Sequence, residues 1–93
     1  MAVSKTFTGL KCMEIPYSDF TWDSTNTRFI ISNFTPPFNT VVGYLIVPTN
    51  GMAIMSGYYN PVTKLLSIVG WIPVNAGAPI ESSNGFKCFV IGY

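Results

Sequence analysis

The chain has 93 residues, of which 10% are charged and 15% aromatic, and its formal net charge is +1 at pH 7. This length fits a single domain, residues 1–93, with a modest core. The charged fraction is less than half of the roughly 25% that is typical of soluble domains. Because the few basic residues are scattered among acidic ones, the chain lacks the basic patch of a nucleic-acid-binding protein. Much of the surface must be uncharged or apolar, which favours a partner that covers it.

The N-terminal residues 1–5 show no basic segment followed by an apolar one, so no secretory signal is expected. The chain carries no charge from Phe29 to Thr63, but prolines, glycines and asparagines interrupt this region. A membrane-spanning segment needs about 18 consecutive apolar residues, and none occurs. We therefore expect a protein that is synthesised and kept in a cytoplasm, without a membrane partner.

Segments rich in β-branched and aromatic residues alternate with turn-type segments, and no segment has sustained helical periodicity. In chain order, the predicted strands are Thr6–Ile15, Thr27–Phe34, Val41–Val47, Met52–Tyr59, Lys64–Ile72 and Phe86–Ile91. Turns are predicted at Asp23–Asn26 and Ser82–Gly85. The pattern predicts an all-β fold, a small antiparallel sandwich or barrel of five to seven strands.

The middle of the chain predicts a three-stranded meander. Its first turn, Pro48–Gly51, contains Asn-Gly, which supplies the positive-φ positions of a hairpin. Its second turn, Asn60–Thr63, has proline at the position that a type I turn favours. We expect this meander to lie at the centre of the fold. The proline-containing segments Thr35–Phe38 and Pro73–Pro79 are expected to be ordered connections without strands.

Two predicted strands are apolar on both faces. In Lys64–Ile72, Leu65, Val69 and Trp71 alternate with Leu66, Ile68 and Ile72. The last strand likewise has Phe86, Cys88 and Val90 on one side and Phe89, Ile91 and Tyr93 on the other. A small antiparallel domain has one interior, so the second face is either wrapped by loops or buried against another chain. We favour the second alternative.

Catalytic and metal-binding chemistry is not expected. The sequence contains no histidine, the commonest general base and neutral metal ligand. Cys12 and Cys88 are expected to be reduced thiols buried at inward strand positions, although a disulfide is possible if their strands are neighbours. The acidic residues Glu14, Asp19 and Asp23 match no glycosidase or calcium-loop pattern and are expected to stabilise turns. No catalytic residue, metal ligand or cofactor is predicted.

Aromatic side chains are the remaining candidates for a binding site. Exposed aromatic faces near asparagine and aspartate can stack on sugar rings, but aromatics also anchor protein interfaces and fill β-sheet cores. The candidate binding or interface residues are Trp22, Tyr58, Tyr59 and Trp71.

The C-terminal stretch Ser82–Tyr93, 12 of the 93 residues, resembles the closing turn and strand of small β-domains in tailed-bacteriophage virion proteins. This resemblance implies a non-enzymatic structural protein of the virion, often with three-fold symmetry. Because the chain opens with Met1, we expect a free-standing capsid decoration (cement) protein, a homotrimer that contacts the major capsid protein. The alternative is a carbohydrate- or receptor-binding module, such as a tail-fibre tip, with a surface glycan as partner.

Overall fold

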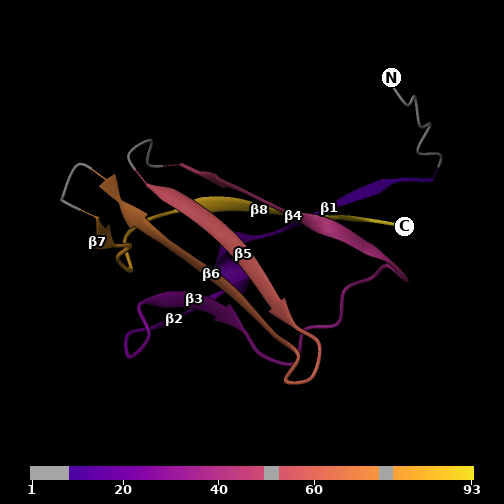
Figure 1. Cartoon of the computed structure of the whole chain (residues 1–93), viewed down its shortest axis with the longest axis horizontal. Helices are drawn as coiled ribbons and strands as arrows, with labels where there is room; N and C mark the ends of the chain where they lie inside the picture. The colour runs from indigo at the N-terminus through magenta and orange to yellow at the C-terminus, as the bar shows by residue number, and fades with distance from the viewer. Residues whose placement is uncertain (1–8, 50–52, 74–76) are drawn as a thin grey trace, which may run out of the picture.

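The computed structural model describes residues 9–49, 53–73 and 77–93, and all its strand pairs are antiparallel. The strands form two sheets packed against each other (Figure 1). The three-stranded sheet has the order β1–β8–β4, with bounds Lys11–Ile15, Phe86–Gly92 and Val41–Pro48. The five-stranded sheet has the order β2–β3–β6–β5, with bounds Thr21–Asp23, Arg28–Ile31, Leu65–Ile72 and Ile54–Asn60. Its fifth strand, β7 (Ala78–Pro79), also pairs with β6.

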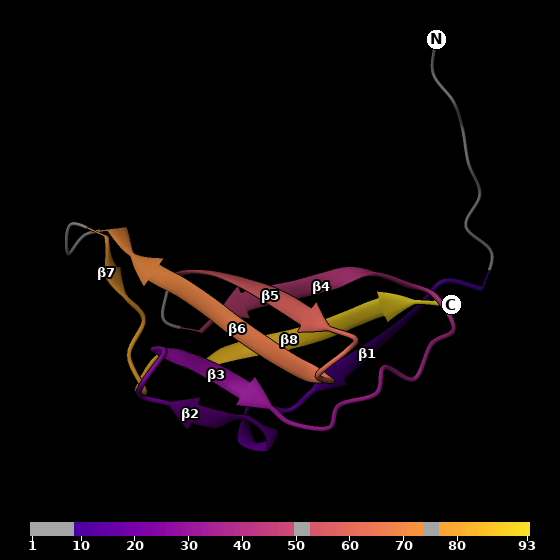
Figure 2. The same ribbon diagram turned by 60° about the horizontal axis from the view of Figure 1, so that its bottom comes forward.

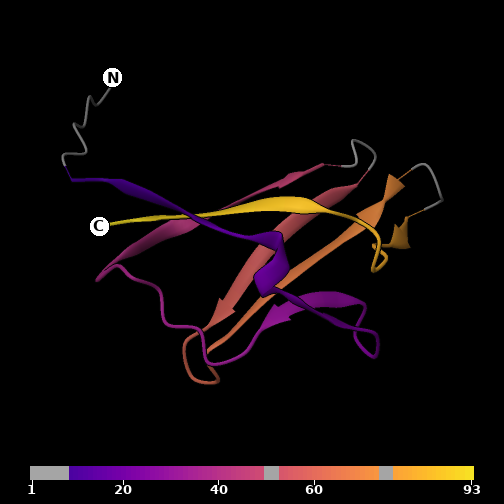
Figure 3. The ribbon, with the colours of Figure 1, turned by 180° about the vertical axis from the view of Figure 1, so that it is seen from behind.

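The predicted all-β sandwich is confirmed. Figure 2 shows β3, β6 and β5 as one layer in front of β8 and β4, and Figure 3 shows β8 and β1 in front when the molecule is seen from behind. Within the described residues the strands number eight when the two-residue β7 is included, one more than the predicted five to seven. A short 3-10 helix, η1 (Tyr17–Asp19), connects β1 of one sheet to β2 of the other.

The core lies between the two sheets and follows the alternation of the strands. The inner face of β6 supplies Leu66 and Ile68, and that of β8 supplies Cys88 and Val90, all fully buried. The rings of Phe29 and Phe86 meet edge to face across the two sheets, with centroids 5.1 Å apart. The remaining buried apolar residues are Ile15, Ala53, Ile72 and Ile80.

The predicted hairpin between β5 and β6 is confirmed. Asn60 Oδ1 accepts hydrogen bonds from the backbone N–H groups of Val62 and Thr63, at 2.9 and 3.3 Å. These bonds form the side-chain-stabilised turn that asparagine favours. The strands pair over their whole length, from Ile54↔Trp71 to Asn60↔Leu65.

The predicted hairpin between Val41–Val47 and Met52–Tyr59 is wrong. β4 pairs with β8 in the three-stranded sheet, whereas β5 pairs with β6 in the five-stranded sheet. Consecutive strands of a sandwich can cross from one sheet to the other, so both can bury an apolar face in the same core. The predicted Asn50-Gly51 turn lies outside the described residues, as do residues 6–8 of the first predicted strand.

Two short strands were not expected. β2 pairs with β3 through a turn in which Asp23 Oδ1 accepts from the backbone N–H groups of Thr25 and Asn26. The other, β7, falls in a segment predicted to be strand-free because of its prolines. Only two residues pair there, and the Ile80 N–H continues the contact by donating to Gly70 O at 3.2 Å. Proline is tolerated at the end of such a short edge strand.

Candidate functional site

The four aromatic candidates separate into two pairs. Tyr58 and Trp71 lie on the outer face of the five-stranded sheet, where their exposed fractions are 61% and 48%. Trp22 and Tyr59 are half-buried and pack against the core. The sequence placed Tyr58, Tyr59 and Trp71 in predicted strands and Trp22 outside them. It could not distinguish outward from inward positions on strands that are apolar on both faces.

Trp22 and Tyr59 have structural roles. The Trp22 ring meets Phe29 edge to face, with centroids 4.8 Å apart. Tyr59 packs edge to face against Phe34, and its hydroxyl donates to the Phe34 backbone carbonyl at 2.5 Å. Both side chains are poorly placed as stacking platforms, because they are half-buried and pack against the core between the sheets.

Tyr58 and Trp71 lie on one continuous surface. Tyr58 pairs with Ser67 and Ile54 with Trp71, so Tyr58 and Trp71 belong to rows separated by four residues along β6. At about 3.3 Å per residue, this separation is roughly 13 Å. Ser56 and Val69, which pair in the row between them, have side chains smaller than either ring. The outer face therefore presents two separated aromatic rings with low side chains between them.

A polar cluster lies beside Tyr58 on the same outer face. Arg28 Nε donates to Asp23 Oδ2 at 3.0 Å, and Arg28 Nη1 donates to Ser67 Oγ at 3.2 Å. Ser67 points outward yet is only 3% exposed. Side-chain hydrogen bonds from Asn26 first, and then from Arg28, hold the pKa of Asp23 below its usual value. The carboxylate and the guanidinium are thus fixed in place with no net charge.

The sequence analysis missed Arg28 and assigned Asp23 to a turn only. The turn assignment is confirmed, but Asp23 and Arg28 are also directly opposite each other in β2 and β3. Opposite charges flanking a short turn of Ser, Thr and Asn are the signal that would have revealed this pair.

The outer face of the three-stranded sheet is apolar and bears no such cluster. Leu45 and Val47 on β4 are exposed, and Phe89 and Ile91 on β8 are half-buried beside them. Among the outward positions of its strands, Glu14 and Lys87 are the charged residues. In the part of the chain that the structure describes, neither forms an ion pair, in contrast to Asp23 and Arg28.

The two cysteines are free, and their side chains lie on different faces. Their strands are neighbours, but Cys12 pairs with Ile91 and Cys88 with Ile15. The expected burial is confirmed for Cys88, which is fully buried in the core, and wrong for Cys12, which is exposed on the outer face. Burial raises the pKa of the Cys88 thiol to about 11. A buried, protonated thiol is a poor nucleophile.

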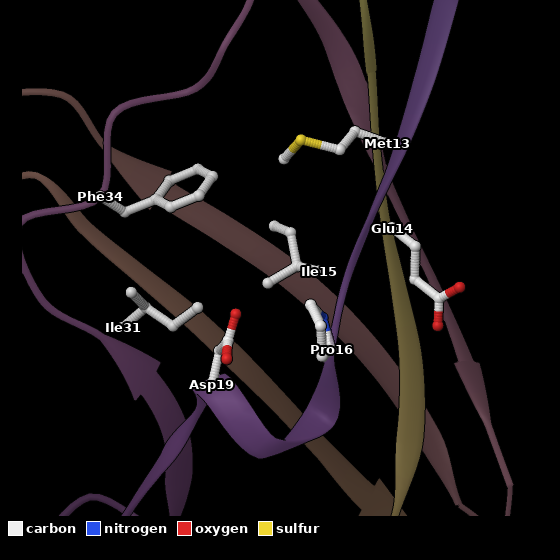
Figure 4. A pocket seen from close by; sticks show the side chains of 7 residues that line it. All are labelled: Met13, Glu14, Ile15, Pro16, Asp19, Ile31 and Phe34. Atoms are coloured by element: carbon white, nitrogen blue, oxygen red, sulfur yellow. The ribbon is translucent and has the colours of Figure 1, made fainter.

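The acidic residues of the N-terminal half do not form one site. A cleft of about 460 Å³ lies between β1, η1 and the segment after β3, and Glu14 and Asp19 are among its lining residues. Figure 4 shows Met13, Ile15, Ile31 and Phe34 around its centre, whereas the Glu14 side chain leaves β1 on the other side. Asp23 lies in the β2–β3 turn instead. The described residues that line the cleft include no nucleophile beside a general base, and the Glu14 and Asp19 carboxylates do not face each other across it.

No family model, curated protein or solved structure matches the chain. Within residues 9–49, 53–73 and 77–93, no three His, Cys, Asp or Glu side chains gather as a metal site would require. The same residues form no helix with the length and apolar character needed to cross a membrane. Function is therefore argued from the two outer faces of the sandwich.

Proposed function

We propose that this chain is a non-enzymatic structural subunit that associates with copies of itself through the outer face of the three-stranded sheet. The observation that carries the proposal is the apolar surface formed there by Leu45, Val47, Phe89 and Ile91. Exposed contiguous apolar surface is characteristic of interaction sites. The setting that we propose is a phage particle, with the chain as a trimeric capsid decoration protein on the major capsid protein.

The charges on this face support a second copy as the occupant. The face carries one acid, Glu14, and one base, Lys87, which are not paired with each other in the described residues. When copies meet through this face, Glu14 of one copy can lie opposite Lys87 of the next. This pairing of unlike charges favours association and disfavours misaligned arrangements. The outer face of the five-stranded sheet differs, because its Asp23 and Arg28 already satisfy each other.

The mass in solution tests the association. Light scattering coupled to size exclusion should give about three times 10.2 kDa for the wild-type chain. Leu45→Asp should give the monomer mass, because it places a charge in the apolar face. Val62→Asp is the matched control: Val62 is 89% exposed in the β5–β6 turn, so its replacement should leave the mass unchanged. A monomeric wild-type chain at high concentration would contradict the proposal.

Charge reversal provides a second test. Glu14→Lys and Lys87→Glu should each weaken association by creating like charges across the interface, and the double variant should restore it. Equal association of all four proteins would mean that these charges do not face each other between copies. Electron microscopy of particles from the source of the gene then tests the virion setting by locating the added density.

A second candidate function, binding of a saccharide or receptor, is favoured by the exposure of Tyr58 and Trp71. These rings project from the sheet opposite to the proposed association face. The two functions are compatible, since each uses a different outer face.

A further inference from the structure

We infer that the outer face of the five-stranded sheet binds a neutral oligosaccharide, held by stacking on Tyr58 and Trp71 and by hydrogen bonds from Arg28. This inference rests on the second candidate function above and assigns the class of ligand and the contacts. It does not depend on self-association, which concerns the other sheet.

The aromatic contacts set the minimum size of the ligand. Tyr58 and Trp71 lie in rows about 13 Å apart, a distance longer than one monosaccharide ring. Ser56 and Val69, between them, leave space above the sheet for a chain that bridges the two rings. Aromatic side chains with a polar edge suit a ligand with apolar faces and hydroxyl rims. An oligosaccharide, rather than a single sugar, satisfies both platforms.

The polar cluster sets the charge of the ligand. Sugar hydroxyls accept hydrogen bonds, and Arg28 can donate them, because the guanidinium has five N–H groups and only Nε and Nη1 donate within the described residues. The two Asp23 oxygens already accept from Thr25, Asn26 and Arg28, so Asp23 serves to hold Arg28 in place. Arg28 is fixed by Asp23 and Ser67, at 3.0 and 3.2 Å, so binding requires little ordering of its side chain. Ser67 is directly opposite Tyr58, which places the cluster next to one aromatic platform. Since Asp23 cancels the charge of Arg28, the cluster favours neutral hydroxyls over an acidic sugar.

The first experiment is an array of neutral and acidic oligosaccharides probed with the intact chain. Binding to neutral oligosaccharides is expected. Tryptophan fluorescence then measures affinity for the neutral oligosaccharide that binds and for its monosaccharide. The monosaccharide should bind at least about tenfold more weakly, because it can contact one platform only.

Single substitutions test the contacts. Binding should weaken about tenfold or more in each of three variants, Tyr58→Ala, Trp71→Ala and Arg28→Gln. Calorimetry measures the affinity of Trp71→Ala, because this substitution removes the tryptophan at the site. Tyr93→Ala is the matched control, because Tyr93 is similarly exposed, at 54%, but follows β8 of the other sheet. Circular dichroism and melting curves establish that each variant is folded. Equal losses in Tyr93→Ala and Tyr58→Ala would overturn the assigned contacts.

The outcomes separate this inference from the function on which it rests. Binding restricted to sialylated or uronic-acid oligosaccharides would overturn the neutral ligand class but retain saccharide binding. No binding to any saccharide on the array would overturn both. Capture of a protein through the same face, lost in Trp71→Ala, would assign the two aromatics to a protein interface instead.

Discussion

The Tyr44 side chain combines a half-buried ring with a buried hydroxyl that has no hydrogen-bond partner among the described residues. An unpaired buried hydroxyl costs free energy of folding because it loses its bonds to water. Tyr44→Phe should therefore raise the free energy of unfolding, by about 1 kcal/mol. Urea denaturation measures the change.

Tyr59→Phe is the control for this prediction. The Tyr59 hydroxyl donates to Phe34 O, so its removal should lower the free energy of unfolding by about 1 kcal/mol. If Tyr44→Phe destabilises the protein as much as Tyr59→Phe does, the Tyr44 hydroxyl has a partner that we have not identified.

Stability should fall at alkaline pH. Burial, with smaller effects of Tyr59 and Cys88, raises the pKa of Tyr44 to about 12, and burial raises that of Cys88 to about 11. In the unfolded chain these groups ionise at their ordinary values, near 10 and 9. The unfolded state thus releases protons first, so stability is intact below pH 9 and declines as pH rises to 11 and 12.

Urea midpoints at a series of alkaline pH values measure this decline. Tyr44→Phe removes one of the two groups, so its midpoint should fall less steeply above pH 10 than that of the wild type. Identical slopes in the two proteins would show that Tyr44 does not contribute.

The two cysteines should differ in reactivity. Cys12 is exposed and Cys88 fully buried, so an aromatic disulfide reagent should label one thiol rapidly in the native protein and two in denaturant. Cys12→Ser should abolish the rapid phase, whereas Cys88→Ala should retain it. Rapid labelling of both thiols in the native wild type would contradict the placement of Cys88.

At the scale of elements, the β5–β6 hairpin depends on a close approach at Gly70. A Cβ there would overlap Ile54 O and lie 3.0 Å from Met55 Cα, both backbone atoms of the paired strand. Gly70→Ala should therefore separate the strands and lower the free energy of unfolding by about 2 kcal/mol. Thermal or urea unfolding measures the loss.

Gly43→Ala is the matched control in β4. A Cβ at Gly43 would meet nothing within 4 Å, so the free energy of unfolding should change by less than about 0.5 kcal/mol. Comparable effects of the two substitutions would contradict the close contact between β5 and β6.

At the scale of the whole molecule, both outer faces of the sandwich are poor in charge. Each carries one acid and one base at its outward strand positions, but only Asp23 and Arg28 form an ion pair among the described residues. This difference is the reason for assigning self-association to one face and saccharide binding to the other. The inner faces form the single core.

Self-association should make thermal stability depend on protein concentration. Because only folded chains associate, association stabilises the native state by mass action. The melting temperature should therefore rise over a hundredfold increase in protein concentration. Calorimetry at several concentrations measures the rise. In Leu45→Asp the melting temperature should be independent of concentration; equal dependence in both proteins would place the interface elsewhere.

The strand-type segments, the Asn60–Thr63 turn and the all-β class follow from local sequence. Side-chain alternation and turn residues act over a few positions, so they are readable without knowledge of the fold. The same alternation showed that β6 and β8 are apolar on both faces. The aromatic residues from which the candidate site is built were identified by their residue type and by the Asn and Asp residues near them in the sequence.

Sheet pairing, and the direction in which each candidate aromatic points, depend on contacts between distant segments. β4 lies beside β8 rather than β5 because both sheets must bury one face in a shared core. Tyr58 and Tyr59 are adjacent in sequence and equally apolar, but neighbouring side chains of a strand point to opposite faces. Only the packing of the second sheet against Tyr59 leaves Tyr58 exposed, and only the pairing of β3 with β6 brings Arg28 to Ser67.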